Sequence, residues 1–165
     1  MVIQIKKSNF SNKKYTQMGL ERAYVRMNSL TTLWFNTGTL CNLSCRDCYT
    51  DSSPRNDSLV YLSLEEVKSF LNEVDLLDLS TNQIGFTGGE PFMNPHIIEM
   101  IKESIKLEKN VLILTNAMRP MMKLEKDILK LKKYSEKICF RVSLDHFTKV
   151  NHEYIRGKNS WKPAI

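Results

Sequence analysis

Three cysteines, Cys41, Cys45 and Cys48, stand in one short stretch at the spacing C-x3-C-x2-C. Thiolates that converge from one loop can bind three of the irons of a cubane iron–sulfur cluster. A closed four-iron cluster usually takes four cysteines, so three leave one iron open to an outside ligand. An open coordination position is typical of a reactive metal site rather than a structural one. The spacing therefore predicts a four-iron cluster with one reactive iron.

Zinc is the alternative metal for these thiols, with a fourth ligand from elsewhere in the chain. Structural zinc sites usually combine two ligand pairs, and the sequence offers no second cysteine pair. A disulfide framework is disfavoured because three clustered thiols and one distant thiol do not pair evenly. The spacing therefore favours an iron–sulfur cluster over zinc. The candidates for a fourth zinc ligand are Cys139, His96, His146 and His152.

The composition is that of an ordinary globular protein. Its 165 residues are enough for one domain with a hydrophobic core, and 42% of them are hydrophobic. Residues 1–10 lack the apolar run of a signal peptide, and no apolar stretch is long enough to predict a transmembrane helix. We therefore expect a cytoplasmic protein with no membrane partner, in the compartment where thiols stay reduced.

The formal net charge of +6 permits weak attraction to phosphates. The lysines are dispersed over predicted helices, so solvated helix faces explain the charge better than a nucleic-acid partner does. Residues 1–29 are basic and polar, and we expect them to form a leader or a short helix around residues 20–27. A helix that flanks the main domain, residues 30–165, is favoured there over a nucleic-acid-binding arm.

Strand patterns alternate with helix patterns along the main domain. Residues 31–37, 83–87, 111–115 and 138–145 are rich in β-branched and apolar residues, and each stretch predicts a strand. Helical periodicity marks the segment before the second predicted strand. It also marks the two segments that separate the second, third and fourth strands. This order is typical of an α/β fold with a parallel sheet and right-handed crossovers.

Local signals mark where the predicted helices begin. Ser63 and Glu66 form a capping-box pattern, and Asn94 with Pro95 predicts the N-cap and first turn of the second helix. Apolar residues at helical spacing mark the side of each helix that faces the core. They are Leu64, Val67, Leu71 and Val74 in the first helix, Ile97, Ile98, Ile101 and Ile105 in the second, and Leu124, Ile128 and Leu131 in the third.

Polar clusters follow or finish each predicted strand. They are the cysteine stretch 41–48, residues 88–91, residues 115–116 and residues 143–145. The carboxyl ends of parallel strands meet at one edge of a sheet, and binding and catalytic sites are built at that edge. The sequence therefore predicts a single catalytic face that combines all four clusters.

These clusters resemble the signatures of the radical S-adenosylmethionine (radical SAM) superfamily. The cysteine stretch matches its C-x3-C-x2-C loop, and the residues GGEP at positions 88–91 match its second motif. Residues 115–116 and 143–145 are similar to the polar ends of the family's third and fourth strands. The resemblance covers about residues 31–165.

The resemblance implies two cofactors, a [4Fe-4S] cluster on Cys41, Cys45 and Cys48, and S-adenosyl-L-methionine (SAM) on the open iron. Reductive cleavage of SAM gives methionine and a 5′-deoxyadenosyl radical, which takes hydrogen from a substrate. The cofactors supply this chemistry and the protein positions them. The implied partners are an unknown substrate and an electron donor such as flavodoxin or ferredoxin.

The resemblance also implies the SAM-binding residues. We expect Gly88, Gly89 and Glu90 to meet the methionine end, and Thr115 and Ser143 to meet the nucleoside. Glycines without a Cβ let the backbone approach a ligand closely, and a glutamate adds negative charge for the ammonium group.

The alternation of the fourth strand predicts which way its side chains point. We expect Ser143 to face the site and Phe140 to face the helices. Cys139 stands apart from the other thiols, and a small buried residue is the simpler interpretation of it.

Two features depart from the family's pattern. The aromatic residue that family members carry before the last cysteine is replaced by Asp47, while Tyr49 follows Cys48. The family's core is a partial (β/α) barrel of six strand–helix units, and this chain supplies four strands, with residues 160–165 as the expected start of a fourth helix.

Such a partial core carries further expectations. We expect an exposed fourth strand through which chains could associate, and weak or absent SAM cleavage by the chain alone. Whether it is an enzyme by itself is left open. The alternative is an iron–sulfur or zinc module, or an inactive fragment, without SAM chemistry.

Overall fold

The computed structural model describes residues 12–165, so the first part of the expected leader lies outside the described residues. Within them the chain forms a single parallel sheet in the strand order β1-β2-β3-β4. The sheet confirms the α/β class and the four parallel strands. They are β1 (Thr32–Asn36), β2 (Gln83–Thr87), β3 (Asn110–Thr115) and β4 (Ile138–Val142).

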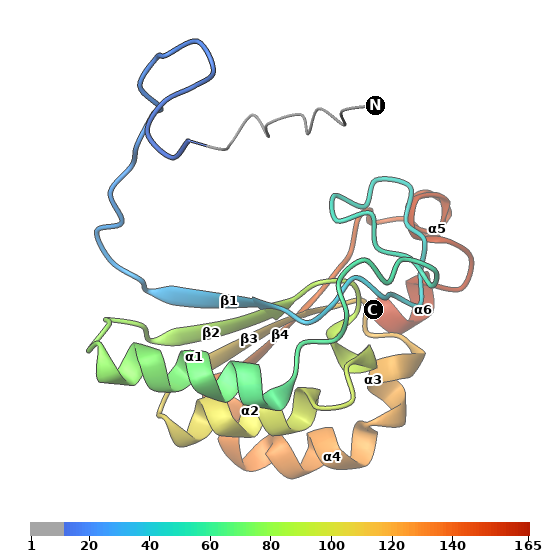
Figure 1. Cartoon of the computed structure of the whole chain (residues 1–165). Coiled ribbons are helices and arrows are strands. Elements are labelled where there is room, and N and C mark those ends of the chain that lie inside the picture. Colours follow the sequence, from blue (N-terminus) through green and yellow to red (C-terminus); the bar gives the residue numbers. More distant parts are fainter. Residues whose placement is uncertain (1–11) are drawn as a thin grey trace, which may run out of the picture.

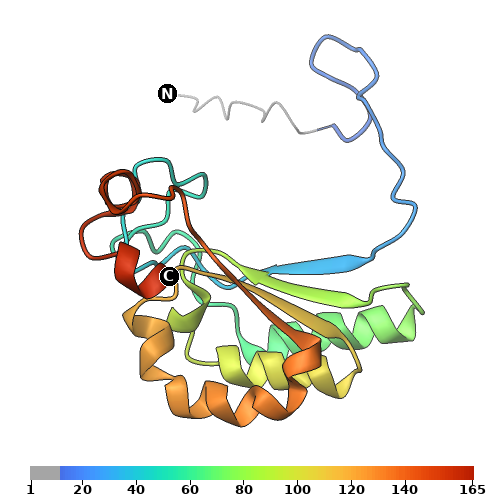
Figure 2. The ribbon, with the colours of Figure 1, turned by 180° about the vertical axis from the view of Figure 1, so that it is seen from behind.

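Helices cover one face of this sheet and leave the other face open (Figure 1). The view from behind shows the same one-sided arrangement (Figure 2). Two short helices that follow β4 lie instead at the carboxyl end of the strands. The helices are α1 (Leu64–Leu76), α2 (Ile97–Lys106), α3 (Arg119–Lys123), α4 (Glu125–Lys130), α5 (Lys149–Arg156) and α6 (Trp161–Ala164), with 3-10 turns η1 (Pro91–Met93) and η2 (Leu131–Lys137).

The hydrophobic core lies between the sheet and the helical layer. One side of each central strand points into it, as in Ile84 and Phe86 of β2, which are fully buried. The predicted apolar stripe of α2 is buried, and so are Val67, Leu71 and Val74 of α1. Phe35 of β1 stacks on Phe86 with ring centroids 5.7 Å apart. The core therefore fixes the strands whose ends carry the polar clusters.

The predicted starts of the first two helices have different outcomes. The capping box of α1 is present: Glu66 N–H donates to Ser63 Oγ, and Ser63 N–H donates to the Glu66 carboxylate at 2.8 Å. The second helix begins later than predicted, at Ile97 with His96 as its N-cap. Asn94 instead accepts from His96 N–H and donates to the Leu62 carbonyl oxygen. Asn94 directly follows the η1 turn, and its hydrogen bonds join this loop to the loop that precedes α1.

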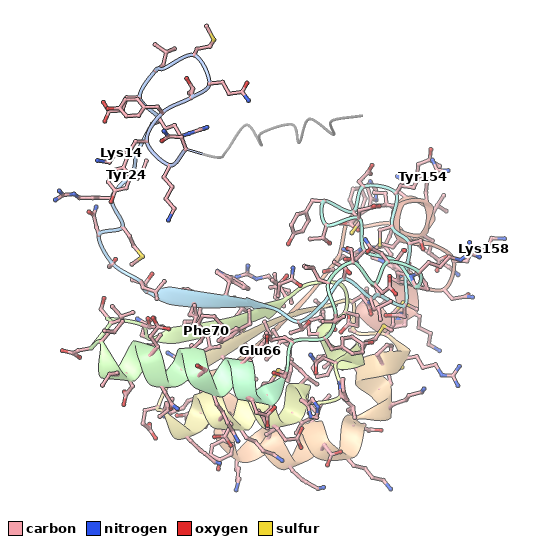
Figure 3. All side chains as sticks on the ribbon, in the orientation of Figure 1. Lys14, Tyr24, Glu66, Phe70, Tyr154 and Lys158 are labelled. Carbon is pink, nitrogen blue, oxygen red and sulfur yellow. The ribbon has the colours of Figure 1, made fainter. Side chains whose placement is uncertain are left out.

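The predicted helix around residues 20–27 is wrong. That segment is extended, and an isolated antiparallel bridge joins Tyr15 to Glu21. The side chains of Tyr24 and Val25 are 82% and 90% exposed, so the segment has no apolar surface to pack on. Short helices depend on such packing for stability. Figure 3 shows Tyr24 of this segment, and Lys14 of the stretch before it, away from the sheet.

Strand β4 is an edge strand of the described sheet, as predicted, and it ends at Val142. Phe140 packs toward the helices against Phe92, with ring centroids 6.1 Å apart. Cys139, expected to be buried, is exposed because it lies on the opposite, open side of this edge strand. After the strand, Ser143 N–H still donates to the Thr115 carbonyl oxygen at 2.9 Å, so the ladder reaches the predicted polar cluster.

None of the helices in the described part of the chain is long and apolar enough to cross a membrane.

Candidate active site

The four polar clusters surround one pocket at the carboxyl end of the strands. The pocket has a volume of about 390 Å³. All three clustered cysteines line it, together with Gly88, Gly89 and the ends of β3 and β4. The structure therefore brings together segments that are more than a hundred residues apart in the sequence, such as those of Cys41 and Asp145.

The cysteine loop, residues 41–53, is attached to the molecule at several points. Cys41 N–H donates to the Ser53 carbonyl oxygen at 3.1 Å, which closes the loop on itself. Arg46 N–H donates to the carbonyl oxygen of Ile155 in α5 at 2.9 Å. The Arg46 guanidinium also lies 4.0 Å from the ring centroid of Tyr154. The loop is held between the end of β1 and the helix that follows β4.

Hydrogen bonds from the loop's own backbone reach two of the three sulfurs. Leu43 N–H donates to Cys41 Sγ at 3.4 Å, and Ser52 N–H donates to Cys48 Sγ at 3.3 Å. The Thr50 hydroxyl lies 3.3 Å from Cys48 Sγ. Hydrogen bonds to thiolate sulfurs are among the features that tune iron–sulfur clusters. The donor set of the loop therefore suits such a cluster.

The three thiols ionise differently. Burial raises the pKa of Cys41 to about 11, and burial also raises the pKa of Cys45. Burial raises the pKa of Cys48 as well, but hydrogen bonds from Thr50 and Ser52 outweigh it and the net pKa is lowered. Metals bind the thiolate form. Cys48 is therefore the thiol of the three whose surroundings favour the thiolate form.

The GGEP segment packs against the chain that leads into the cysteine loop. Gly89 N–H donates to the Gly38 carbonyl oxygen at 2.8 Å, and Glu90 N–H donates to that of Leu40 at 3.1 Å. A Cβ on Gly89 would lie 2.1 Å from the Leu40 carbonyl oxygen, and one on Gly88, whose φ is 130°, would lie 2.6 Å from that of Gly38. The glycines are thus required by this close packing, a reason that the sequence pattern did not reveal.

Glu90 lies behind the pocket rather than in it. Its side chain is 2% exposed, and its carboxylate accepts hydrogen bonds from the Thr115 hydroxyl at 2.7 Å and from the backbone N–H groups of Asn116 and Phe92. Burial raises its pKa, and these hydrogen bonds act in the opposite direction. The structure directs this carboxylate to the ends of β3 and η1, and its expected contact with SAM stays a prediction.

The other expected SAM-binding residues line the pocket. Gly88, Gly89, Thr115 and Ser143 all contribute to its wall. The Thr115 hydroxyl is already donated to Glu90, whereas no hydrogen bond of the Ser143 hydroxyl is found among the described residues. Asn116 connects this wall to the cysteine loop, since its Nδ2 lies 3.7 Å from Cys41 Sγ and donates to Asn42 Oδ1 at 3.0 Å.

Sequence reasoning missed an ion pair at the rim of the pocket. The guanidinium of Arg156 pairs with the Asp145 carboxylate, and Arg156 is the only cation among the described residues that line the pocket. Arg156 ends α5, a short polar helix in which His152 is the one buried residue. The backbone N–H of Asp145 in turn donates to Nδ1 of the buried His152 at 3.4 Å.

The zinc alternative finds no support in the geometry. No group of three or more His, Cys, Asp or Glu side chains in residues 12–165 is arranged to hold a single metal ion. A zinc ion needs every ligand at about 2.0–2.3 Å from one centre, whereas a four-iron cluster binds each thiolate on a separate iron. His146 and His152 stand at a zinc-like spacing, but His152 is fully buried against Trp161. The three thiols around one pocket fit a cluster.

Residues 35–165 match the Radical SAM superfamily. The chain belongs to the radical SAM superfamily. Its cofactors are accordingly a [4Fe-4S] cluster and SAM, and the expected partial barrel is the family's fold.

Two curated radical SAM relatives match at the sequence level. The chain is 36% identical over 118 residues to the antilisterial bacteriocin subtilosin biosynthesis protein AlbA of Bacillus subtilis, which is 72% of this chain and 25% of AlbA. It is 31% identical over 125 residues to the GTP 3′,8-cyclase of Photorhabdus laumondii, which is 74% of this chain and 36% of that enzyme. The chain therefore spans between a quarter and about a third of these relatives.

Solved structures of SuiB from Streptococcus suis share the fold. The structure of SuiB bound to S-adenosylmethionine aligns with a TM-score of 0.63 at 20% identity, over 77% of this chain and 28% of SuiB. The structure of SuiB bound to its precursor peptide SuiA aligns with a TM-score of 0.62 at the same identity. These alignments confirm the architecture of the strands and helices around the pocket.

Proposed function

We propose that Cys41, Cys45 and Cys48 hold the [4Fe-4S] cluster and that the pocket beside them binds SAM. The observation that carries this proposal is the position of the three thiols, which line one pocket together with Gly88, Gly89 and Ser143. Three protein thiolates leave one iron of a four-iron cluster without a protein ligand. When bound, the cluster and SAM supply the reductive cleavage that defines the family.

Residues of the pocket wall give SAM its orientation in this proposal. Gly88 and Gly89 present backbone groups to its methionine end, and Ser143 presents a hydroxyl to its nucleoside. Arg156 supplies the positive charge for its carboxylate, since a guanidinium binds carboxylates through paired hydrogen bonds. Glu90 and Thr115 act indirectly, because their mutual hydrogen bond fixes the wall from behind.

We further propose that the substrate is a peptide. AlbA is by name a bacteriocin biosynthesis protein, and SuiB has been solved with a precursor peptide. Tyr49 lines the pocket and is 86% exposed, so it offers an aromatic surface to a bound peptide. We place this activity in the cytoplasm, where the thiols stay reduced.

The proposal is tested by anaerobic reconstitution of the chain with iron and sulfide. We expect about four irons and four sulfides per chain, as in other four-iron clusters. The electron paramagnetic resonance (EPR) spectrum of the reduced cluster should change when SAM is added, because SAM fills the open iron position. A spectrum that is identical with and without SAM would show that the pocket does not deliver SAM to the cluster.

The substrate class needs a separate test. The chain is incubated with SAM, a reductant and either a deuterated peptide mixture or deuterated GTP, the second because one relative is a GTP cyclase. We expect deuterium in 5′-deoxyadenosine only with the peptides. Transfer from GTP alone would overturn the peptide assignment and leave the SAM assignment intact.

A further inference from the structure

The short helix α3 is flanked by two grooves that do not belong to the active-site pocket. The first, of about 520 Å³, lies between η1 and α3 and is lined by Asn42, Phe92, Arg119 and Lys123 among others. The second, of about 390 Å³, is bordered by Met122, Trp161 and residues of α5 and α6. The two grooves together with α3 form one surface, which we call the α3 surface.

The α3 surface is positively charged. Arg119 and Lys123 line the first groove and Lys149 and Lys162 line the second, where Glu153 is the one carboxylate. None of these four cations takes part in an ion pair found within residues 12–165. Their charges are therefore available to an external acidic partner.

Methionines lie among these cations. Met93 lines the first groove and Met122, which is 54% exposed, lines the second. Met118 and Met121 lie between them at the start and middle of α3 and are half-buried. Methionine side chains adapt to different partners and are common on protein-binding surfaces. The combination of cations and methionines suits a transient protein contact better than a small anion.

The α3 surface and the active-site pocket lie on two sides of the cysteine loop. Cys41 and Leu43 line the active-site pocket, whereas Asn42 between them lines the first groove. The Nδ2 group of Asn116 joins the two sides, because it donates to Asn42 Oδ1 at 3.0 Å and lies 3.7 Å from Cys41 Sγ. A redox partner seated in this groove would be separated from a cluster ligand by a single residue of backbone.

We propose that the α3 surface is the docking site of a small acidic flavoprotein electron donor of the flavodoxin type. This inference rests on the proposed function, because the electron is accepted by the cluster. One electron passes from the anionic flavin hydroquinone, which becomes the neutral semiquinone, to the oxidised cluster, and no bond is made or broken. The cations attract the acidic donor. Asn42 lies between the docked donor and Cys41, so the electron has a short path to the cluster ligand.

A third groove, which is not part of the α3 surface, is also basic and serves as the control. It has a volume of about 650 Å³ and contains five lysines, but none of its residues belongs to the cysteine loop. Three of those lysines are engaged in ion pairs, with Glu103, Asp127 and Glu108. Lys102 and Lys133 are the two lysines of this groove without such a pair among the described residues. The double variant Lys102→Glu/Lys133→Glu therefore changes the net charge by the same amount as a double variant on the α3 surface.

The test uses the reconstituted chain, the double variant Arg119→Glu/Lys123→Glu and the control double variant. Two quantities are measured with a purified flavodoxin at low and high salt: the dissociation constant, and the rate at which flavodoxin hydroquinone reduces the cluster. At low salt, we expect the Arg119→Glu/Lys123→Glu variant to bind flavodoxin at least about tenfold more weakly than the unaltered chain. Its cluster should also be reduced at least about tenfold more slowly. The control variant should stay within about twofold of the unaltered chain, and reduction by dithionite should be equal in all three.

The outcomes separate the docking site from the cluster site. Equal flavodoxin binding by the two double variants would overturn the α3 surface as the docking site. An unaltered chain that takes up no iron would contradict the proposed function instead, and the flavodoxin dissociation constants would still decide the docking site. If the Arg119→Glu/Lys123→Glu variant takes up less iron than the unaltered chain, the pair Lys149→Glu/Lys162→Glu on the second groove replaces it and the same comparison applies.

Discussion

The wall and the rim of the active-site pocket are built in opposite ways. The wall is formed by residues 88–89 and 115–116, with Glu90 behind it. Thr115, Asn116 and Glu90 are buried, and the Glu90 carboxylate accepts hydrogen bonds from Thr115 and Asn116. The rim, formed by Asp145 and Arg156, is more exposed and is held by one ion pair and by the contacts of a short helix. Burial makes the wall sensitive to single atoms, whereas the rim can be altered without disturbing the fold.

The largest effect is expected from Gly89→Ala in the wall. The added Cβ would lie 2.1 Å from the Leu40 carbonyl oxygen, so the backbone that leads into the cysteine loop must shift. Overpacking of this kind costs about 1–3 kcal/mol or more. We expect a lower melting temperature and loss of most bound iron, measured by thermal unfolding and by iron analysis.

Gly85→Ala is the matched control for this variant. Its Cβ would lie 2.3 Å from the ring of Trp34, but that side chain is 45% exposed on the open face of the sheet and can move aside. Equal iron loss in the two variants would show that any bulk added to the sheet removes the cluster. The special packing of the GGEP segment would then be contradicted.

Glu90→Gln should have an intermediate effect. All three hydrogen-bond partners of this carboxylate are donors, so the amide of glutamine turns its own donor group toward one of them. Loss of a hydrogen bond to a charged group costs about 1.5–3 kcal/mol. We expect a melting temperature reduced by several degrees at neutral pH, with the three cysteines still able to bind iron.

The same variant should change the pH dependence of stability. Burial raises the pKa of Glu90 above its usual value of 4.5, so the folded state holds this proton more tightly than the unfolded state does. The contribution of this group to stability is then complete below pH 4.5 and falls as the pH rises through the folded-state pKa. Denaturant unfolding across this range should show a smaller decrease for Glu90→Gln than for the unaltered chain.

Arg156→Ala at the rim should leave the fold and the cluster in place but weaken SAM binding. Loss of a charged hydrogen bond of about 1.5–3 kcal/mol corresponds to a dissociation constant raised roughly tenfold to a hundredfold. Lys158→Ala is the control, since Lys158 is an exposed cation two residues away (Figure 3). Titration of the reduced cluster with SAM measures the affinity, and equal affinity in both variants would remove Arg156 from the binding site.

The smallest effect is expected from Tyr154→Phe. It removes only the hydrogen bond of 2.6 Å between the Tyr154 hydroxyl and Arg46, on a side chain that is 64% exposed. The guanidinium still lies over the aromatic ring. We expect a change in stability below about 0.5 kcal/mol and unchanged iron content. A large loss of iron would mean that the rim supports the cysteine loop as strongly as the wall does.

The wall and Asp145 of the rim were predictable from the sequence, and Arg156 was not. Motif spacing and the ends of apolar strands identified the cysteines, Gly88, Gly89 and Ser143, because parallel strands place their carboxyl ends together. The direction of the Glu90 carboxylate could not be read, since it depends on donors from Thr115 and Asn116, 25 and 26 residues further along the chain. Arg156 was missed because it ends a short polar helix, and its place at the pocket depends on the ion pair with Asp145 in the preceding loop.

The same contrast explains the fold. The core strands and the Ser63 cap follow from local periodicity and hydrogen-bonding chemistry, and the structure contains them. The segment 20–27 has helix-forming residues but no surface to pack on, and it is extended. Cys139 was misjudged because its burial depends on which side of an edge strand is covered.

Single substitutions of the cysteines test the central claim most directly. Each of Cys41→Ala, Cys45→Ala, Cys48→Ala and Cys139→Ala is reconstituted anaerobically, and iron, sulfide and the EPR spectrum with SAM are measured. We predict loss of the four-iron cluster in each of the first three variants. Cys139→Ala should retain the iron content and the SAM-dependent spectrum of the unaltered chain, because Cys139 lies on β4 and does not line the pocket. Loss of the cluster in Cys139→Ala would indicate a closed four-cysteine site and contradict the open iron on which the account depends.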